Sequence, residues 1–64
     1  MLLKFDGRLY ARGAVDRAVE AYAEHAKIKV TEQGGVIGVE LKGEEVDAEL
    51  ADEFSNYVLG GMSR

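Results

Sequence analysis

The chain has 64 residues, a net charge of −4 and no cysteine. A chain of this length forms a single domain, residues 1–64, and buries only about 60% of the surface that its unfolded form exposes, which leaves little material to enclose an active-site pocket. The acidic balance argues against general affinity for the phosphate backbone of nucleic acid, and the lack of cysteine excludes disulfides and fits a reducing cytoplasm.

The first predicted element is a half-buried strand over residues 2–10, because apolar and polar side chains alternate there. One face would carry Leu3, Phe5 and Leu9, and the other Lys4, Asp6 and Arg8. Tyr10 would end the strand on the outer face, and Gly7 indicates a bulge or bend. Because Lys4 and Asp6 interrupt the apolar start, we expect no signal peptide, and since no stretch reaches transmembrane length we expect a soluble protein.

A helical pattern follows over residues 14–26, where apolar residues recur at intervals of three and four. The residues on this face are Val15, Ala18, Val19, Tyr22 and Ala26. The five alanines between positions 14 and 26 favour the helix and let it lie close to its neighbours.

Two further strands should form an antiparallel hairpin, residues 27–32 and 36–42. Ile28 and Val30 of the first strand would point inward, as would Ile37, Val39 and Leu41 of the second. The turn over residues 33–35 contains two glycines, which adopt positive φ without penalty.

The final helix is predicted over residues 46–59 from one apolar stripe, made of Val46, Leu50, Phe54, Tyr57 and Val58. Asp47 is a plausible N-cap, although Glu44 and Glu45 could begin the helix earlier. Gly60 and Gly61 are expected to end the helix in a left-handed cap, followed by a short tail over residues 62–64.

These elements define an α+β fold in the order β-α-β-β-α. We expect a two-layer sandwich, with a three-stranded mixed sheet and both helices on one face. A right-handed crossover through the first helix would bring the first strand alongside one strand of the hairpin in parallel.

The residues that usually carry chemistry form no recognisable constellation. His25 is the only histidine, and one imidazole makes a poor metal site, so we assign it to the end of the first helix as a favourable charge. Neither glycine pair precedes a helix, as a phosphate-binding loop requires. Asp52 and Glu53 are neighbours on a helix, so their carboxylates point about 100° apart and cannot share a substrate proton. We therefore expect no enzymatic activity, no catalytic or metal-binding residues and no cofactor.

The charges are distributed unevenly along the chain. An acidic block contains Glu44, Glu45, Asp47, Glu49, Asp52 and Glu53 without an intervening base. It is either a solvated helix face favoured by the helix dipole or a docking surface for a basic partner. The edges of the small sheet either pair with a second copy or an extended peptide, or are protected by lysines. Because the chain lacks disulfides, we expect a homo-oligomer or a complex with a protein or peptide, and no nucleic-acid or membrane partner.

The segment Glu53-Phe54-Ser55-Asn56-Tyr57-Val58-Leu59 resembles the closing E-F-x-N-x-x-L segment of the HxsD and HxsD-like proteins. Leu9-Tyr10 leading into an alanine-rich helix with Tyr22, and the following hairpin, are similar to the earlier part of that family. The resemblance implies a bacterial accessory protein of the His-Xaa-Ser system, encoded beside radical S-adenosylmethionine maturases and a short precursor peptide. Any iron–sulfur cluster would belong to a partner, since this chain has no cysteine.

The sequence thus supports two functional hypotheses. The first is a non-catalytic binding module that assists radical-SAM-dependent peptide maturation by holding the precursor or the maturase, with Glu53, Asn56 and Tyr57 as candidate partner contacts. The second is a small structural homodimer whose role is assembly.

Overall fold

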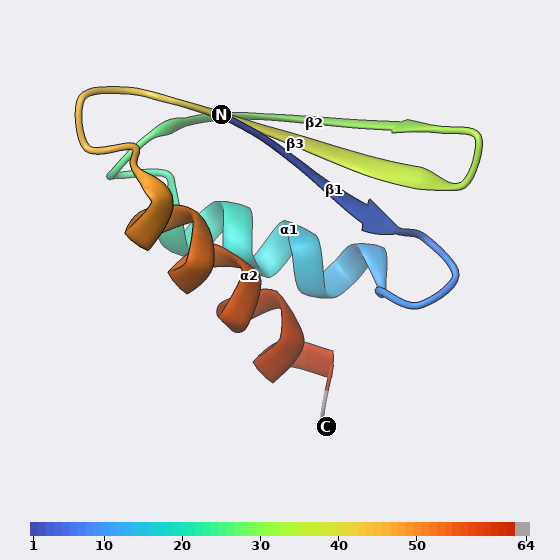
Figure 1. The fold of residues 1–64 in the computed structure, drawn as a ribbon. Coiled ribbons are helices and arrows are strands. Elements are labelled where there is room, and N and C mark those ends of the chain that lie inside the picture. The colour runs from blue at the N-terminus through green and yellow to red at the C-terminus, as the bar shows by residue number, and fades with distance from the viewer. Residues whose placement is uncertain (63–64) are drawn as a thin grey trace.

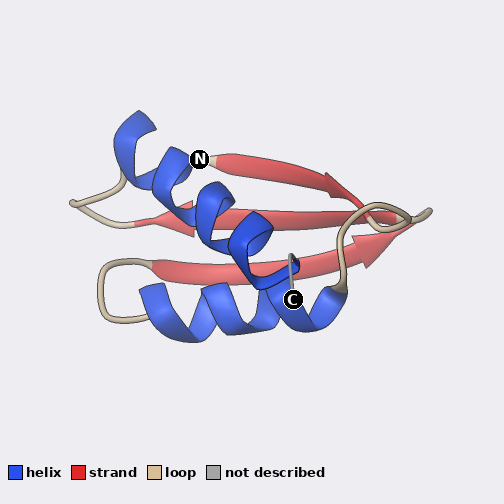
Figure 2. Ribbon diagram, turned by 90° about the horizontal axis from the view of Figure 1, so that it is seen from below, coloured by secondary structure: helices blue, strands red, loops and turns tan. Residues whose placement is uncertain are grey.

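The computed structural model describes residues 1–62 as one sheet of three strands covered by two helices (Figure 1). The elements, in chain order, are β1 (Leu2–Asp6), α1 (Arg12–Tyr22), β2 (Lys27–Gln33), β3 (Val36–Lys42) and α2 (Ala48–Met62). Both helices lie on the same side of the sheet, and the other side is open (Figures 1 and 2). The predicted α+β sandwich and its β-α-β-β-α order are confirmed.

The sheet is antiparallel throughout, so the expected mixed pairing is wrong. The strand order is β1-β3-β2, and β3 pairs antiparallel with both neighbours. β1 and β2 do run in the same direction, but β3 lies between them. The central place suits β3, whose inward residues Ile37, Val39 and Leu41 are at most 1% exposed. On the edge strands, by contrast, the inward residues Leu3, Ile28 and Val30 are only half-buried.

The hydrophobic core lies between the sheet and the two helices. Its buried members are Phe5, Ala14, Val15, Ala18, Ile37, Val39, Leu41, Ala51, Phe54 and Val58. Phe54 is fully buried, as its place in the apolar stripe predicts, and its ring lies 6.4 Å from that of Phe5. Tyr57 of the same stripe is 46% exposed, so the stripe reaches the surface there.

β1 is shorter than predicted and ends at Asp6. The backbone carbonyl of Asp6 accepts hydrogen bonds from the amides of Leu9 and Tyr10, which closes a turn directly after the strand. Leu9 is consequently 69% exposed, and Tyr10 packs edge-on against Phe5 with ring centres 5.0 Å apart. The expectations that Leu9 faces inward and that Tyr10 lies on the open face are therefore wrong.

The hairpin agrees closely with the sequence. Gly34 and Gly35 have φ of 60° and 79°, the pair of positive angles that a two-residue type I′ turn requires. The turn joins Gln33 to Val36, which are paired across the strands. α1, by contrast, ends at Tyr22 rather than at residue 26, and residues 23–26 form a turn.

α2 begins at Ala48, directly after the candidate N-cap Asp47 and not at the earlier start that Glu44 and Glu45 allowed, and it ends later than predicted. The Asp47 carboxylate accepts a 2.8 Å hydrogen bond from the Leu50 amide, so Asp47 is the N-cap. Gly60 and Gly61 lie inside the helix, and neither has positive φ, so the predicted left-handed cap is wrong. The predicted tail begins at Met62, which is the last residue of α2, and residues 63–64 lie outside the described part of the chain.

Candidate partner-binding site

The three candidate contact residues, Glu53, Asn56 and Tyr57, lie together on one exposed side of α2. Their spacing of three and four residues places them on the same face of the helix. All three side chains are exposed, and none belongs to the core. The structure therefore brings together the three residues that the sequence nominated.

Their neighbour across the helix pair is Tyr22, the last residue of α1. Its ring packs edge-on against Tyr57 and against Phe54, at centroid distances of 5.8 and 5.7 Å. Burial raises the pKa of the Tyr22 hydroxyl, and the negative charge of Glu53 and the nearby Tyr57 raise it further. A tyrosine with a raised pKa stays neutral at physiological pH, so this cluster offers aromatic surface and a hydroxyl to a partner.

An open depression lies further along the same pair of helices. It is lined by Arg17 of α1 and by Tyr57, Gly60 and Gly61 of α2. The two glycines lack side chains, which leaves the depression between an arginine and a tyrosine. This combination suits contact with a protein surface, where both residue types are enriched.

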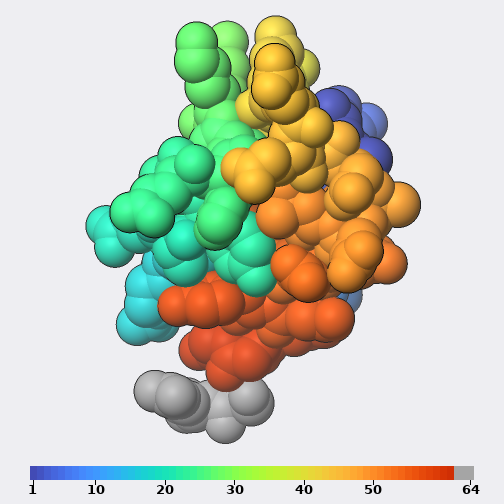
Figure 3. Space-filling view, turned by 90° about the vertical axis from the view of Figure 1, so that its left-hand side faces the viewer, coloured from blue at the N-terminus to red at the C-terminus, as the bar shows by residue number. Residues whose placement is uncertain are grey.

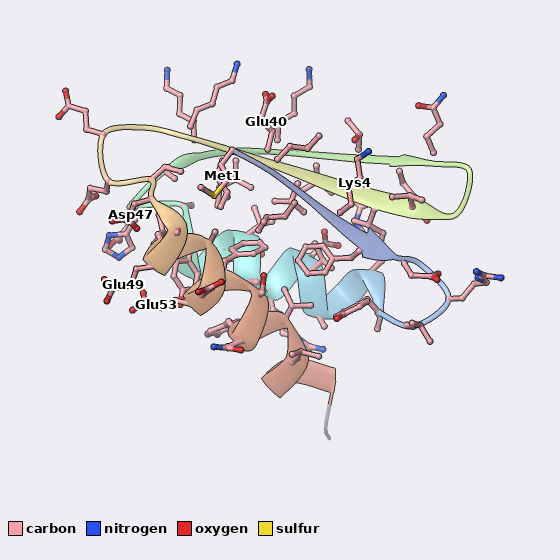
Figure 4. The ribbon with its side chains drawn as sticks, viewed as in Figure 1. Met1, Lys4, Glu40, Asp47, Glu49 and Glu53 are labelled. Atoms are coloured by element: carbon pink, nitrogen blue, oxygen red, sulfur yellow. The ribbon has the colours of Figure 1, made fainter. Side chains whose placement is uncertain are left out.

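The acidic block forms one end of the molecule. Asp47, Glu49 and Glu53 project from the first turns of α2, on the side away from the sheet (Figure 4). The turn after α1 lies beside the segment that leads into α2 (Figure 3), and there His25 Nδ1 is 3.6 Å from a carboxylate oxygen of Glu45. Both side chains are exposed. Among residues 1–62, no three histidine, cysteine or acidic side chains are grouped in a way that could hold a metal ion.

The open face of the sheet has the opposite charge. It carries four lysines, Lys4, Lys27, Lys29 and Lys42. Its acidic residues are Glu40, which lies 3.4 Å from Lys42, and Asp6 at the end of β1. Lys4 and Glu40 point away from the helices (Figure 4). Leu2 and Val36 add exposed apolar surface to this face.

The pair formed by Asp6 and Arg8 fixes the turn at the end of β1. The Arg8 amide donates to Asp6 Oδ1 at 2.8 Å, and the guanidinium donates to both carboxylate oxygens. The side-chain hydrogen bonds from Arg8, followed by its backbone hydrogen bond, lower the pKa of Asp6. The open face therefore keeps a negative charge at this end.

Sequence reasoning identified the residues on α2 but missed what surrounds them. Tyr22 was expected on the apolar face of the first helix, and nothing in the sequence places it against Tyr57 or places Arg17 beside the same depression. The available signal was the apolar spacing of the first helix, in which Tyr22 is the last large side chain, and there burial is incomplete.

Taken together, the fold and its surfaces define a small α+β domain whose described polar side chains lie on its exterior. Within residues 1–62, neither helix has the length and apolar character needed to cross a bilayer. Comparisons with protein-family models, with curated proteins and with solved structures found no match to the chain.

Proposed function

We propose that this protein is a non-catalytic binding module that acts by holding a peptide or protein partner against its surface. The observation that carries the proposal is the free outer edge of β1. Within residues 1–62 the strand order leaves β1 at one edge with β3 as its single neighbour, and an edge strand presents unpaired backbone donors and acceptors. Proteins commonly recognise extended peptides by adding them to such an edge.

The composition of the core supports the same proposal. Every side chain in the buried cluster is apolar, so the polar groups of the described chain remain at the surface, where partners have access. Glu53, Asn56 and Tyr57, with Arg17 and Tyr22 beside them, offer a second contact area on the helices. Tyrosine and arginine are the residues that most often dominate binding energy at interfaces.

The resemblance to the HxsD-like proteins suggests a setting for this activity. We propose that the module acts in the cytoplasm and assists radical-SAM-dependent peptide maturation by holding the precursor or the maturase. The radical chemistry would reside in the maturase, because this chain has no cysteine to ligate an iron–sulfur cluster.

The test is titration with the proteins encoded beside this gene. Isothermal titration calorimetry with a neighbouring precursor peptide and with a neighbouring maturase should give micromolar or tighter binding to at least one of them. Amide NMR spectra of the labelled module would locate the contact. Failure of both partners to bind at micromolar concentrations would overturn the proposal.

A second candidate function is assembly as a structural homodimer. It is favoured by exposed large apolar residues at the sheet, namely Met1, Leu2 and Val36. A dimer would show a melting temperature that rises with protein concentration, because association stabilises the folded state by mass action. A melting temperature independent of concentration, with a monomeric mass in solution, would reject this alternative.

A further inference from the structure

The hydrogen bonds at the start of β1 show which of its backbone groups point away from the sheet. The amide of Leu41 donates to the carbonyl of Met1 at 2.7 Å, and the nitrogen of Met1 donates to the carbonyl of Leu41 at 2.8 Å. In an antiparallel pair, residues that exchange both bonds alternate with residues that exchange none. By the observed register, Leu3 and Phe5 therefore bond to β3, while Leu2 and Lys4 direct their backbone groups outward.

The end of the strand limits how far this edge extends. The carbonyl of Asp6 is already occupied by the amides of Leu9 and Tyr10. The free edge consequently offers the N–H and C=O of Leu2, the N–H and C=O of Lys4, and the N–H of Asp6. Figure 2 shows β1 along one side of the sheet, and no other strand of residues 1–62 lies beyond it.

We propose that this edge binds an extended, acidic segment of a partner protein as an additional strand. This inference rests on the proposed binding function and names the partner's chemistry. Side chains of an added strand would alternate between the open face and the helix layer. On the open face, the residue opposite Lys4 would meet a cation that forms no ion pair within residues 1–62, so a carboxylate there is complementary.

The helix side of the added strand has a different requirement. Leu3 is only half-buried because it lies on the edge strand, although it packs against the core cluster. An apolar residue in the incoming strand would cover Leu3. The recognised segment therefore alternates acidic and apolar side chains.

A second copy of this chain fits the edge less well, because the two symmetric registers that form the most hydrogen bonds give Lys4 no carboxylate. A register centred on Lys4 places the two lysines opposite one another, and like charges directly opposite are destabilising in a sheet. A register centred on Leu3 forms as many hydrogen bonds, because the carbonyl of Asp6 is occupied, but it places Leu2 opposite Lys4. A register centred on Phe5 places Asp6 opposite Lys4 but depends on that occupied carbonyl. A foreign strand can place a carboxylate opposite Lys4 without this cost.

The experiment uses a short blocked peptide in which glutamate alternates with valine, titrated into the labelled full chain and followed by amide NMR. We expect the largest shifts at Leu2, Lys4 and Asp6. A peptide with lysine in place of glutamate should bind more weakly, and so should the glutamate peptide with its alternate amides methylated, because methylation removes the donors that strand pairing needs.

Two charge reversals test the role of Lys4. Lys4→Glu should weaken binding of the glutamate peptide about fivefold, because two carboxylates would then lie opposite one another. The same change should strengthen binding of the lysine peptide, because a carboxylate would then lie opposite a lysine. Lys27→Glu is the matched control, because Lys27 is an exposed lysine of the same face but belongs to the opposite edge strand. It should leave both affinities nearly unchanged.

The outcomes separate this inference from the broader function. If a neighbouring precursor or maturase binds but shifts only α2 residues such as Asn56 and Tyr57, and neither peptide shifts β1, the strand-addition inference is wrong while the binding function stands. Equal weakening by the two reversals, or equal binding of methylated and unmethylated peptides, would also overturn it. If neither peptide nor protein binds, both proposals fail.

Discussion

Gly61 of α2 lies directly against Ala14 of α1. A Cβ atom placed on Gly61 would be 3.4 Å from the Cβ of Ala14, at the short end of ordinary contact. The two helices thus approach through their smallest residues, and Ala14 is 1% exposed as a result. For Gly60, one position earlier, no heavy atom of residues 1–62 outside its two chain neighbours and the backbone of its own helix lies within 4 Å of a Cβ placed on it.

Substitutions at these two glycines should therefore have opposite effects on stability. Gly60→Ala should raise the free energy of unfolding by about 0.5–1 kcal/mol, because alanine restricts the unfolded chain and favours helix. Gly61→Leu should lower it by about 1–3 kcal/mol by forcing the helices apart. Urea denaturation followed by circular dichroism measures both. Destabilisation by Gly60→Ala, or tolerance of leucine at position 61, would contradict the packing described.

The same glycines show a limit of sequence reasoning. A glycine pair after an apolar helical stripe is typical of a C-terminal cap, and the local sequence offers no reason to prefer another interpretation. The reason lies in α1, more than forty positions earlier in the chain, where Ala14 requires a small neighbour. Contacts of this kind become visible only when the crossing of the two helices is known.

At the start of α2 the deciding interaction is local, and the candidate N-cap Asp47, one of the two starts that the sequence allowed, is confirmed. Asp47→Ala should destabilise the protein by about 1 kcal/mol, because it removes the acceptor for the Leu50 amide. Asp47→Asn is the matched control and should cost only a few tenths, since asparagine caps nearly as well. Chemical denaturation of the two variants gives the comparison. Equal losses would show that the charge of Asp47, rather than its hydrogen bond, stabilises the helix.

A third prediction concerns acid stability at the end of β1. Because hydrogen bonds from Arg8 lower the pKa of Asp6 in the folded state, the Asp6 carboxylate stabilises the fold above its unfolded pKa. That contribution is lost as the pH falls below about 4 and through the folded pKa. Asp6→Asn should therefore lower the melting temperature at neutral pH. The difference in melting temperature between this variant and the wild type should become smaller as the pH falls below about 4. If the difference in melting temperature stayed the same from neutral to acidic pH, the ionised Asp6 carboxylate would not be what stabilises the fold here.

The contact area on the helices can be tested through Tyr22. Burial is the largest cause of its raised pKa and the charge of Glu53 the next, so Glu53→Gln should lower the pKa of Tyr22 but leave it above the ordinary value of about 10. Glu49→Gln removes the same charge from the same helix face and should leave the pKa of Tyr22 nearly unchanged. Carbon NMR of the tyrosine ring during an alkaline titration measures both variants.

The stability of the fold should follow the same titration. Because the folded pKa of Tyr22 is raised, its stabilising contribution is complete below the unfolded pKa and is lost as the pH rises above about 10 and through the folded pKa. Identical alkaline melting curves for the wild type and Tyr22→Phe would contradict this.

The candidate surfaces were predictable to different degrees. Glu53, Asn56 and Tyr57 came from a local segment, and helical spacing alone places them on one face. The free edge of β1 depends on strand order, which the hydrophobic pattern does not specify: either hairpin strand could have taken the middle. The basic open face was predictable, because strand alternation alone places Lys4, Lys29 and Lys42 opposite the inward apolar residues of their strands.

The open face itself contains a tight contact between β2 and β3 that a double-mutant cycle can measure. A Cβ on Gly38 would lie 2.8 Å from Oγ1 of Thr31, its cross-strand partner. Threonine is stiff at χ1, so the clash cannot be relieved cheaply, and Gly38→Ala should destabilise the wild type by about 1–2 kcal/mol.

In a Thr31→Ala background the same Gly38→Ala change should cost little, since the next nearest atoms lie at 3.9 and 4.0 Å. The coupling between the two positions should therefore be about 1 kcal/mol or more, obtained from urea denaturation of the four proteins. Additive effects would mean that Gly38 is required for another reason and that the hydroxyl of Thr31 does not lie over it.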